Sequence, residues 1–327
     1  MNFFRTVGQV RLKTSPYDLL TCKACPFFFI TMLMLNLVVE AAAVGGFAIE
    51  TVTFVRHGNI WIAHLNGENE RQISNLEDCG RPSISHDGSN FSFYCRNGFV
   101  AEQTQLKGPA YETGFGQIYL LHTTKGKSQQ LSFDGLLAAE SPSFSPDGHQ
   151  LVFVGLSEVR ANEEENYTQM FATMSINVAD ISTGKTRKII QHRNAMLDTG
   201  YIYSHPSFSP DGKSILWQHS GSGVSGGFTI MNLDGRISFQ FPMDTEDPTP
   251  YWGPSLTRDG QKVLCFSPAV SDNVEDMIYF VDRKTGKATM VTTGVNPAFV
   301  KMGRLLFLRV GSANGPRMPR RISGSWT

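Results

Sequence analysis

The sequence predicts an all-β fold, a β-propeller with five recognisable four-stranded blades, on three observations. One short phrase recurs five times, an alternating apolar strand follows every copy, and a hairpin signal precedes every copy. Repeats at such a period indicate repeat architectures, and four antiparallel strands repeated radially form propeller blades. The copies are Pro82–Gly88, Pro142–Gly148, Pro206–Gly212, Pro254–Gly260 and a worn fifth, Pro297–Gly303.

Each copy is expected to form a tight turn between two strands. Its proline presets the backbone angle φ, its aspartate bonds the nearby backbone, and its glycine adopts a positive φ. The four clear copies end in Asp-Gly and the fifth ends in Met-Gly. Apolar residues then occupy every second position, which places each pair on one strand face. These pairs are Phe91/Phe93, Leu151/Phe153, Ile215/Trp217, Val263/Cys265 and Leu306/Leu308.

A second strand pair is predicted upstream of each copy. Its turns read Asn66-Gly67, Thr124-Lys125-Gly126, Thr183-Gly184, Asp234-Gly235 and Thr285-Gly286, in segments 60–67, 118–126, 176–185, 230–235 and 278–287. Asn-Gly and Asp-Gly steps between apolar alternations are strong short-range hairpin signals. Residues 51–55 form an extra strand, which we expect to complete the last blade and close the ring. A sixth blade and an incompletely closed ring both stay open.

The phrase Pro-Ser-Phe-Ser-Pro-Asp-Gly, followed by a strand such as Ile215 to Trp217, resembles the propeller repeat of the TolB family, also called WD40-like or PD40. The resemblance covers residues 51–310. It implies a propeller of the kind that serves as a periplasmic scaffold, as the gating domain of prolyl oligopeptidases, or as an oligogalacturonate lyase. TolB itself carries an α/β domain before its propeller, and the 50 residues ahead of this propeller leave no room for one.

Residues 1–43 are predicted to be a signal peptide or an N-terminal anchor. Basic residues precede the apolar stretch Phe27–Val39, and Ala41–Ala43 supplies small residues of the signal-peptidase type. That order is typical of a secretory signal, and the apolar run is shorter than a membrane span of about 20 residues. An uncleaved anchor, or a start wrongly assigned upstream of Met32 or Met34, are the alternatives. We therefore expect a periplasmic or secreted protein, with a flexible tail at 311–327.

The charge balance argues against nucleic-acid binding. The chain has 29 basic and 29 acidic residues, a pI near 7.1 and no basic run. Proteins that bind nucleic acids usually carry a basic patch or stripe. Contact with a membrane is expected only through the N-terminal segment, if that segment is not cleaved.

Three cysteines lie within the predicted propeller. Cys79 and Cys95 stand eight residues on either side of Asp87, so they are placed to face each other across the first turn hairpin. In an oxidising compartment a cross-strand disulfide is the hypothesis, and two unpaired, half-buried thiols are the alternative. Cys265 occupies an inward strand position and is expected to be inert core.

One face of the propeller carries every predicted long loop, at 96–116, 155–173, 191–204 and 242–252. Long loops on a rigid scaffold are the usual seat of recognition, and tyrosine, tryptophan and arginine are enriched at protein interfaces. This face is therefore predicted to bind a protein or peptide of the cell envelope. Its candidate contacts are Tyr111, Glu112, Tyr167, His192, Arg193, Tyr201, Tyr203, Asp247, Tyr251 and Trp252. Ordinary solvated loops are the alternative interpretation.

Catalysis is not the favoured interpretation. The one Gly-x-Ser-x-Gly match, Gly223 to Gly227, lies in a glycine-rich stretch that starts no helix, so no nucleophile elbow, no catalytic residue and no cofactor are predicted. The stretch His205 to Gly221 resembles the segment that places histidines at the channel of oligogalacturonate lyase propellers. That alternative implies a divalent metal on His57, His205 and His219 and a saccharide-active propeller. A third hypothesis is a carbohydrate-binding module that stacks sugars on Tyr251 and Trp252. The favoured function is a non-catalytic binding scaffold.

Overall fold

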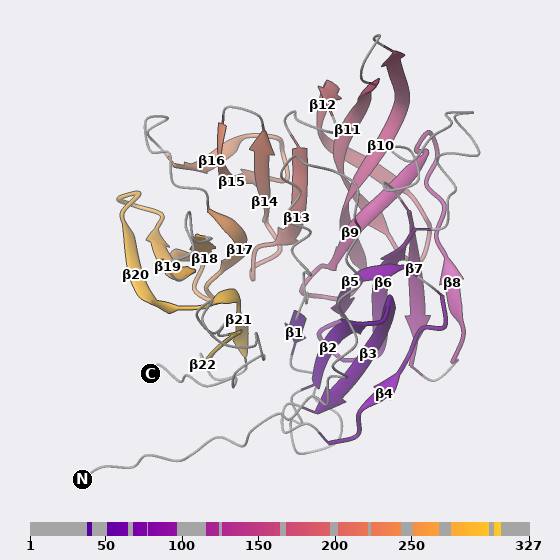
Figure 1. Ribbon diagram of the computed structural model, residues 1–327, viewed down its shortest axis with the longest axis horizontal. Coiled ribbons are helices and arrows are strands. Elements are labelled where there is room, and N and C mark those ends of the chain that lie inside the picture. The colour runs from indigo at the N-terminus through magenta and orange to yellow at the C-terminus, as the bar shows by residue number, and fades with distance from the viewer. Residues whose placement is uncertain are drawn as a thin grey trace.

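The computed structural model describes residues 38–40, 51–64, 68–76, 78–96, 116–123, 126–163, 168–196, 202–221, 224–242, 251–267, 276–300 and 304–308. The described part is all-β, with five four-stranded antiparallel blades and one two-stranded sheet (Figure 1). The prediction of a propeller with five four-stranded blades is confirmed. No described helix is long and apolar enough to cross a membrane.

Each of the four-stranded sheets is a meander whose strands pair in chain order. The first holds β1 (Val38–Glu40), β2 (Thr51–Arg56), β3 (Asn59–His64) and β4 (Arg71–Gln72). The second holds β5 (Cys79–Ile84), β6 (Asn90–Cys95), β7 (Gln117–His122) and β8 (Ser128–Gln130). The third holds β9 (Ala138–Phe144), β10 (Gln150–Glu163), β11 (Thr168–Asp180) and β12 (Thr186–Met196).

The remaining strands form two blades and a partial one. The fourth blade holds β13 (Ile202–Phe208), β14 (Ser214–Gly221), β15 (Val224–Asn232) and β16 (Ile237–Phe241). The fifth holds β17 (Trp252–Leu256), β18 (Lys262–Ser267), β19 (Met277–Asp282) and β20 (Ala288–Thr293). Within the described residues, the worn fifth phrase forms the two-stranded sheet of β21 (Val295–Val300) and β22 (Arg304–Leu308).

The first strands of the sheets form a ring. β1, β5, β9, β13, β17 and β21 contact one another in that order, and β21 contacts β1 again. Figure 1 shows β1 between β2 and the two-stranded sheet. We call these six the inner strands. The ring therefore closes through the two-stranded sheet, which takes the place of a sixth blade.

The predicted grouping of strands was wrong in two respects. Each recurring phrase lies in the first strand of a blade and in the turn after it, so the hairpin upstream belongs to the preceding blade. The strand at 51–55 pairs with β1 and β3 in the first blade instead of completing the last one. β1 itself lies within the segment predicted to be a signal or anchor. A repeat fixes the period of a ring but not the point where each unit begins.

Two of the predicted long loops are largely strand. β10 and β11 pair from Gln150 with Asp180 to Glu163 with Thr168, and β12 continues through Met196. The segments 155–173 and 191–204 therefore extend the third blade beyond its neighbours, as Figure 1 shows at β10 and β11. Gly155 and the charged residues after it mimic a loop in the sequence, while the hydrogen-bonded ladder holds them in strand geometry.

The recurring turns share one hydrogen-bond network. A hydroxyl on the third residue after the proline donates to the turn aspartate, over 2.5 to 2.6 Å in the four clear copies. The same hydroxyl accepts the backbone N–H five residues further on. These bonds favour the ionised carboxylate, and they lower the pKa of Asp87 to about 2. The network explains why hydroxyl, aspartate and glycine recur together.

The core lies between neighbouring blades. One cluster joins the third and fourth blades and includes Met174 and Ile176 of β11 beside Ile215 and Trp217 of β14. Similar clusters join the fourth to the fifth blade, the first to the second, and the second to the third. Burial between sheets, roughly 25 cal/mol per Å² of apolar surface, is therefore the main force that holds the ring together.

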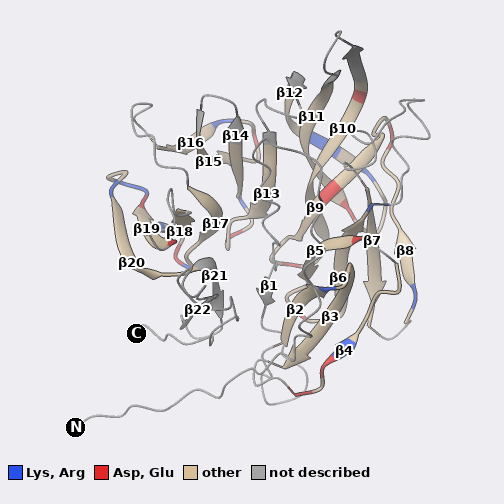
Figure 2. Ribbon diagram, in the orientation of Figure 1, with Lys and Arg blue, Asp and Glu red and all other residues tan. Residues whose placement is uncertain are grey.

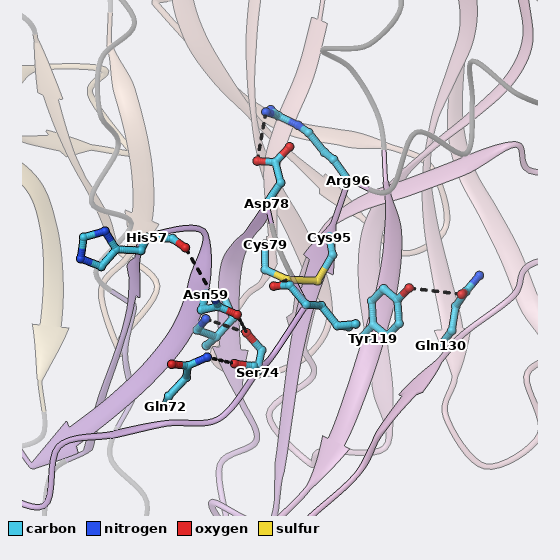
Figure 3. The surroundings of a disulfide bond; sticks show 12 residues. His57, Asn59, Gln72, Ser74, Asp78, Cys79, Cys95, Arg96, Tyr119 and Gln130 are labelled. Carbon is cyan, nitrogen blue, oxygen red and sulfur yellow. Dashed lines mark hydrogen bonds and ion pairs between the residues drawn. A yellow bond between two sulfur atoms is a disulfide. The ribbon is translucent and has the colours of Figure 1, made fainter. Parts of the chain in front are cut away.

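A disulfide joins Cys79 to Cys95 in the second blade, the pairing that the sequence analysis hypothesised. The two residues are direct register partners on β5 and β6. Figure 3 shows the bond at the ends of these strands, next to Asp78 and Arg96. Cys265 is fully buried on β18, where burial raises the pKa of its thiol.

Candidate functional site

The inner strands share an irregularity at the residue that precedes the recurring proline. The pairing of strands one and two shifts register there in each phrase-bearing sheet. Arg81, Ser141 and His205 have φ values of 48°, 55° and 51°, and Gly253 has 58° at the equivalent place. Such values in residues other than glycine cost about 1–3 kcal/mol each and cluster at functional sites. Bulges of this kind re-aim side chains.

The structure gathers four polar residues of three adjacent blades at this level of the ring. Arg81 comes from β5, Glu140 and Ser141 from β9, and His205 from β13. In Figure 2 the acidic residue of β9 stands out in red on a largely tan strand. Arg96, directly after β6, completes the set, since its charge also acts on Glu140. We call these five residues the inner-strand cluster.

Burial and charge set the protonation of this cluster. Burial raises the pKa of Glu140, and the positive charges of Arg81 and Arg96 oppose that effect without cancelling it. Glu140 keeps a partly exposed surface, but the protein atoms around its carboxyl displace enough water for desolvation to dominate. Burial, and then the charge of Arg81, hold the pKa of His205 well below its usual range. His205 is therefore neutral at physiological pH.

Three atoms of the cluster are buried and lack a hydrogen-bond partner among the described residues: Arg81 Nη1, Arg96 Nε and Ser141 Oγ. The Arg96 Nη1 atom lies 3.9 Å from Asp78 Oδ1, and its guanidinium lies 5.8 Å from the centre of the Tyr94 ring. More than nine in ten buried polar groups are normally paired, and an unpaired one costs about 1–3 kcal/mol. The cluster therefore presents hydrogen-bond donors that the described fold does not use.

The cluster lies toward the face predicted to bind. Arg81 is the third residue of β5, and Cys79 at the start of that strand bonds the β2–β3 turn at Gly58. Arg96 follows β6 and bonds the backbone of Asp78 at the same end (Figure 3). The Asp-Gly turns stand at the opposite ends of the inner strands. The face predicted to bind is thus the one from which the second-to-third strand connections leave.

Replacing Glu140 with glutamine is expected to stabilise the protein more at pH 8 than at pH 4. A carboxyl whose folded-state pKa is raised contributes stability that is complete below its ordinary pKa and is lost as the pH rises through the folded-state value. The amide has no such loss, so the stability difference between variant and wild type should grow from pH 4 to pH 8. Urea unfolding at both pH values measures it, with the exposed Asp134→Asn as control. An equal difference at both pH values would contradict the assignment.

The candidate contacts on the long loops are only partly within the described residues. Tyr111, Glu112, Tyr167, Tyr201 and Asp247 lie outside them. Arg193 is exposed on β12, and His192 beside it is half-buried, with its ring 6.3 Å from that of Tyr203. Trp252, the first residue of β17, is half-buried, and its Nε1 atom is buried without a partner among the described residues.

Tyr203 and Tyr251 lie in the core instead of on a solvated loop, which corrects their expected placement. Their exposed fractions are 4% and 5%. Tyr203 packs edge-on against Trp217 with the ring centres 6.1 Å apart, and Tyr251 packs against Phe241 at 4.7 Å. Tyr203 is the second residue of β13 and Tyr251 directly precedes β17, so each tyrosine lies at the start of an inner strand. Neither ring is open to a partner or to a sugar.

The three histidines of the metal hypothesis are not brought together. His57 is exposed in the β2–β3 turn, where Figure 3 shows it pointing away from the disulfide, and His205 belongs to the inner-strand cluster. His219 is 3% exposed on β14, and burial lowers its pKa to about 4. Within the described ranges, no group of three or more His, Cys, Asp or Glu side chains is placed to hold a metal ion.

Arg81 and Glu140 were missed by the sequence analysis. A signal was present: aligning the phrases on their proline places Arg81, Ser141, His205, Gly253 and Asn296 at one position. The side chain at this position differs in every copy, and the residue before the turn aspartate also varies, from His86 to Pro146 and Arg258.

The comparisons with known proteins agree with the fold. No family profile matches the chain. The chain is similar to dipeptidyl-peptidase 5 from Porphyromonas gingivalis, with 26% identity over 221 residues, which are 67% of this chain and 27% of that protein. The chain thus spans little more than a quarter of the length of this curated relative.

Two solved structures share the propeller. TolB from Acinetobacter baumannii superposes with a TM-score of 0.54 and 19% identity, over 81% of this chain and 59% of that one. An oligogalacturonate lyase in complex with manganese superposes with a TM-score of 0.52 and 12% identity, over 86% and 80% of the two chains. At these identities the likeness shows the fold alone, a propeller of the TolB type.

Proposed function

We propose that this protein is a non-catalytic scaffold that binds a protein or peptide segment through the face to which the inner-strand cluster belongs. The observation that carries the proposal is the unpaired buried donor set of Arg81, Arg96 and Ser141. Stability alone does not account for buried polar atoms without partners or for three non-glycine residues with positive φ. A partner that pairs with these groups accounts for both.

The arrangement supports binding better than catalysis. A nucleophile needs a base within hydrogen-bond reach, and in this cluster the only hydroxyl, Ser141, has no hydrogen-bond partner among the described residues. The neutral His205 contacts Ser204, with 3.2 Å between Nδ1 and Oγ, and that serine adjoins it in sequence. No observation in the described part favours the lyase or the sugar-stacking alternative, since the described residues hold no metal-binding group of three or more His, Cys, Asp or Glu side chains and Tyr251 is buried.

We also propose that the protein acts in the periplasm or outside the cell. The leader-like segment at 1–43 supports this location. The Cys79–Cys95 disulfide supports it as well, because such bonds persist in oxidising compartments.

Cross-linking followed by affinity purification tests the proposed function. The full chain is expressed in its own cell, and the partners of three proteins are compared: wild type, Arg81→Gln and Arg71→Gln. Arg71 is exposed on the outer strand β4, so its variant loses the same charge far from the ring. We expect a partner with the wild type and with Arg71→Gln that is lost with Arg81→Gln.

Recovery of no partner with any of the three proteins would overturn the scaffold. Recovery of the same partners with Arg81→Gln would leave the scaffold but overturn the assignment of binding to the inner-strand cluster. Urea unfolding of each variant shows whether a lost partner reflects binding or a lost fold.

A further inference from the structure

We propose that Arg81 and Arg96 bind the carboxylate of an acidic residue in an extended peptide, and that the negative charge of Glu140 opposes this binding. The inference rests on the proposed function and names the chemistry of the partner. It is drawn from the charges and the unpaired donors of the inner-strand cluster.

The cluster has an excess of positive charge. Two guanidinium groups act on one carboxyl, Glu140, and His205 adds no charge because its imidazole is neutral. Arg81 Nη1 and Arg96 Nε are buried donors without partners in the described part of the chain. A guanidinium binds a carboxylate through planar, charge-assisted hydrogen bonds, which are about twice as strong as neutral ones. Arg96 already has Asp78 as an ion-pair partner at 3.9 Å, so an incoming carboxylate would pair the two buried donors and place its charge opposite Arg81.

The backbone around the cluster suits a peptide. β5, β9 and β13 are each the terminal strand of their sheet, so each has one edge without a strand partner in its own blade. Extended peptides bind by adding main-chain hydrogen bonds to such edges, while side-chain pockets supply specificity. The bulges next to Arg81, Ser141 and His205 interrupt the edges at the level where the arginines lie. When an acidic side chain of the peptide binds the arginines at this level, the peptide backbone on either side of it lies along the regularly paired parts of the strands.

Glu140 makes the binding depend on pH. When Glu140 is ionised, its charge offsets those of Arg81 and Arg96 and repels the incoming carboxylate, and when it is protonated this repulsion is absent. Acidic side chains of a peptide, with pKa values near 4, stay largely ionised at pH 5.5. Acidic peptides should therefore bind more tightly at pH 5.5 than at pH 8.

Few other groups bear on Glu140 from the elements packed against β9. The charges of Arg81 on β5 and of Arg96 after β6 act on it, Asp78 forms an ion pair with Arg96, and His205 of β13 is neutral. On β7, His122 lies at the far strand end next to the turn, and on β10 the carboxylate of Glu158 accepts a hydrogen bond from Thr173 over 2.7 Å.

The test uses a library of random seven-residue peptides displayed on phage. It is selected on the full-length wild type at pH 5.5, with Arg81→Gln and Arg71→Gln in parallel. We expect aspartate or glutamate at one fixed position of the peptides enriched on the wild type and on Arg71→Gln. A synthetic peptide from this set should bind Arg81→Gln about tenfold more weakly or worse in fluorescence anisotropy, and its amide counterpart should lose as much on the wild type.

Glu140→Gln separates the role of the opposing carboxylate from that of the arginines. This variant should bind the acidic peptide equally well at pH 5.5 and pH 8, whereas the wild type should weaken at pH 8. A wild type without pH dependence, or a variant that keeps it, would overturn the role of Glu140.

The outcomes distinguish this inference from the proposed function. If no peptide is enriched on any protein, peptide binding itself fails. If peptides bind without a fixed acidic position, or bind Arg81→Gln equally well, the carboxylate site fails while the scaffold stands. Trigalacturonate serves as a probe for an acidic saccharide. Its Arg81-dependent binding, without acid-selective peptides, would overturn the peptide assignment in favour of a sugar carboxylate.

Discussion

Replacing Trp217 with alanine is expected to lower the free energy of unfolding by about 3–5 kcal/mol, the range for removing a large aromatic side chain from a packed core. Trp217 is 2% exposed on β14 and heads the fully buried side chains by volume. It belongs to the cluster that joins the third and fourth blades, and it packs edge-on against Tyr203. The substitution therefore leaves a cavity at a blade interface instead of within one blade.

The matched variants for this prediction are Trp217→Phe and Met290→Ala. Phenylalanine keeps most of the apolar volume and removes an indole Nε1 that is buried without a partner in the described part of the structure. Trp217→Phe should therefore lower the free energy of unfolding by less than half as much as Trp217→Ala. Met290 is 52% exposed on the outer strand β20, and its truncation should change stability by about 0.5 kcal/mol or less. Urea unfolding with an unchanged m-value measures all three. A loss below about 1 kcal/mol in Trp217→Ala would show that the blades do not depend on this contact.

The propeller could be predicted because each recurring phrase encodes its own turn. The hydroxyl of Ser145 binds Asp147 two residues later and the backbone of Gln150 five residues later, so all the information lies within one short segment. The alternation at Leu151 and Phe153 is equally local, and both residues are fully buried. Local signals of this kind can be recognised in the sequence without knowledge of the rest of the fold.

The ring and its site could not be predicted, because they depend on contacts between segments far apart in the chain. Nothing local in Thr51–Arg56 shows that it pairs with Val38–Glu40 instead of the last blade. Arg81 and Glu140 are 59 residues apart in sequence and meet only because their blades are neighbours. Tyr203 and Tyr251 resemble loop residues in the sequence, but they are buried by the neighbouring blades. In each of these cases, contacts between segments far apart in the chain determine the structure, and the local sequence does not.

Removing the Cys79–Cys95 disulfide is expected to lower the free energy of unfolding by about 3 kcal/mol. The bond joins residues 16 apart in sequence, and closing a loop of that size restricts the unfolded chain by about this amount. Both cysteines are also buried in the cluster between the first and second blades, at 5% and 2% exposure. A double replacement with valine keeps apolar volume on the two strands and isolates the effect of the covalent link.

Reduction of the wild type supplies an independent measure of the same quantity. Unfolded wild type should show two more reactive thiols with reductant than without it, and reduced wild type should unfold at the same urea concentration as the valine pair. Cys265 contributes one thiol in either state, and Cys265→Ser shows that the difference does not come from it. Equal thiol counts would reject the bond. If the reduced protein were as stable as the oxidised one, packing and not the disulfide would stabilise the second blade, since Phe91 and Phe93 of the same cluster are also buried.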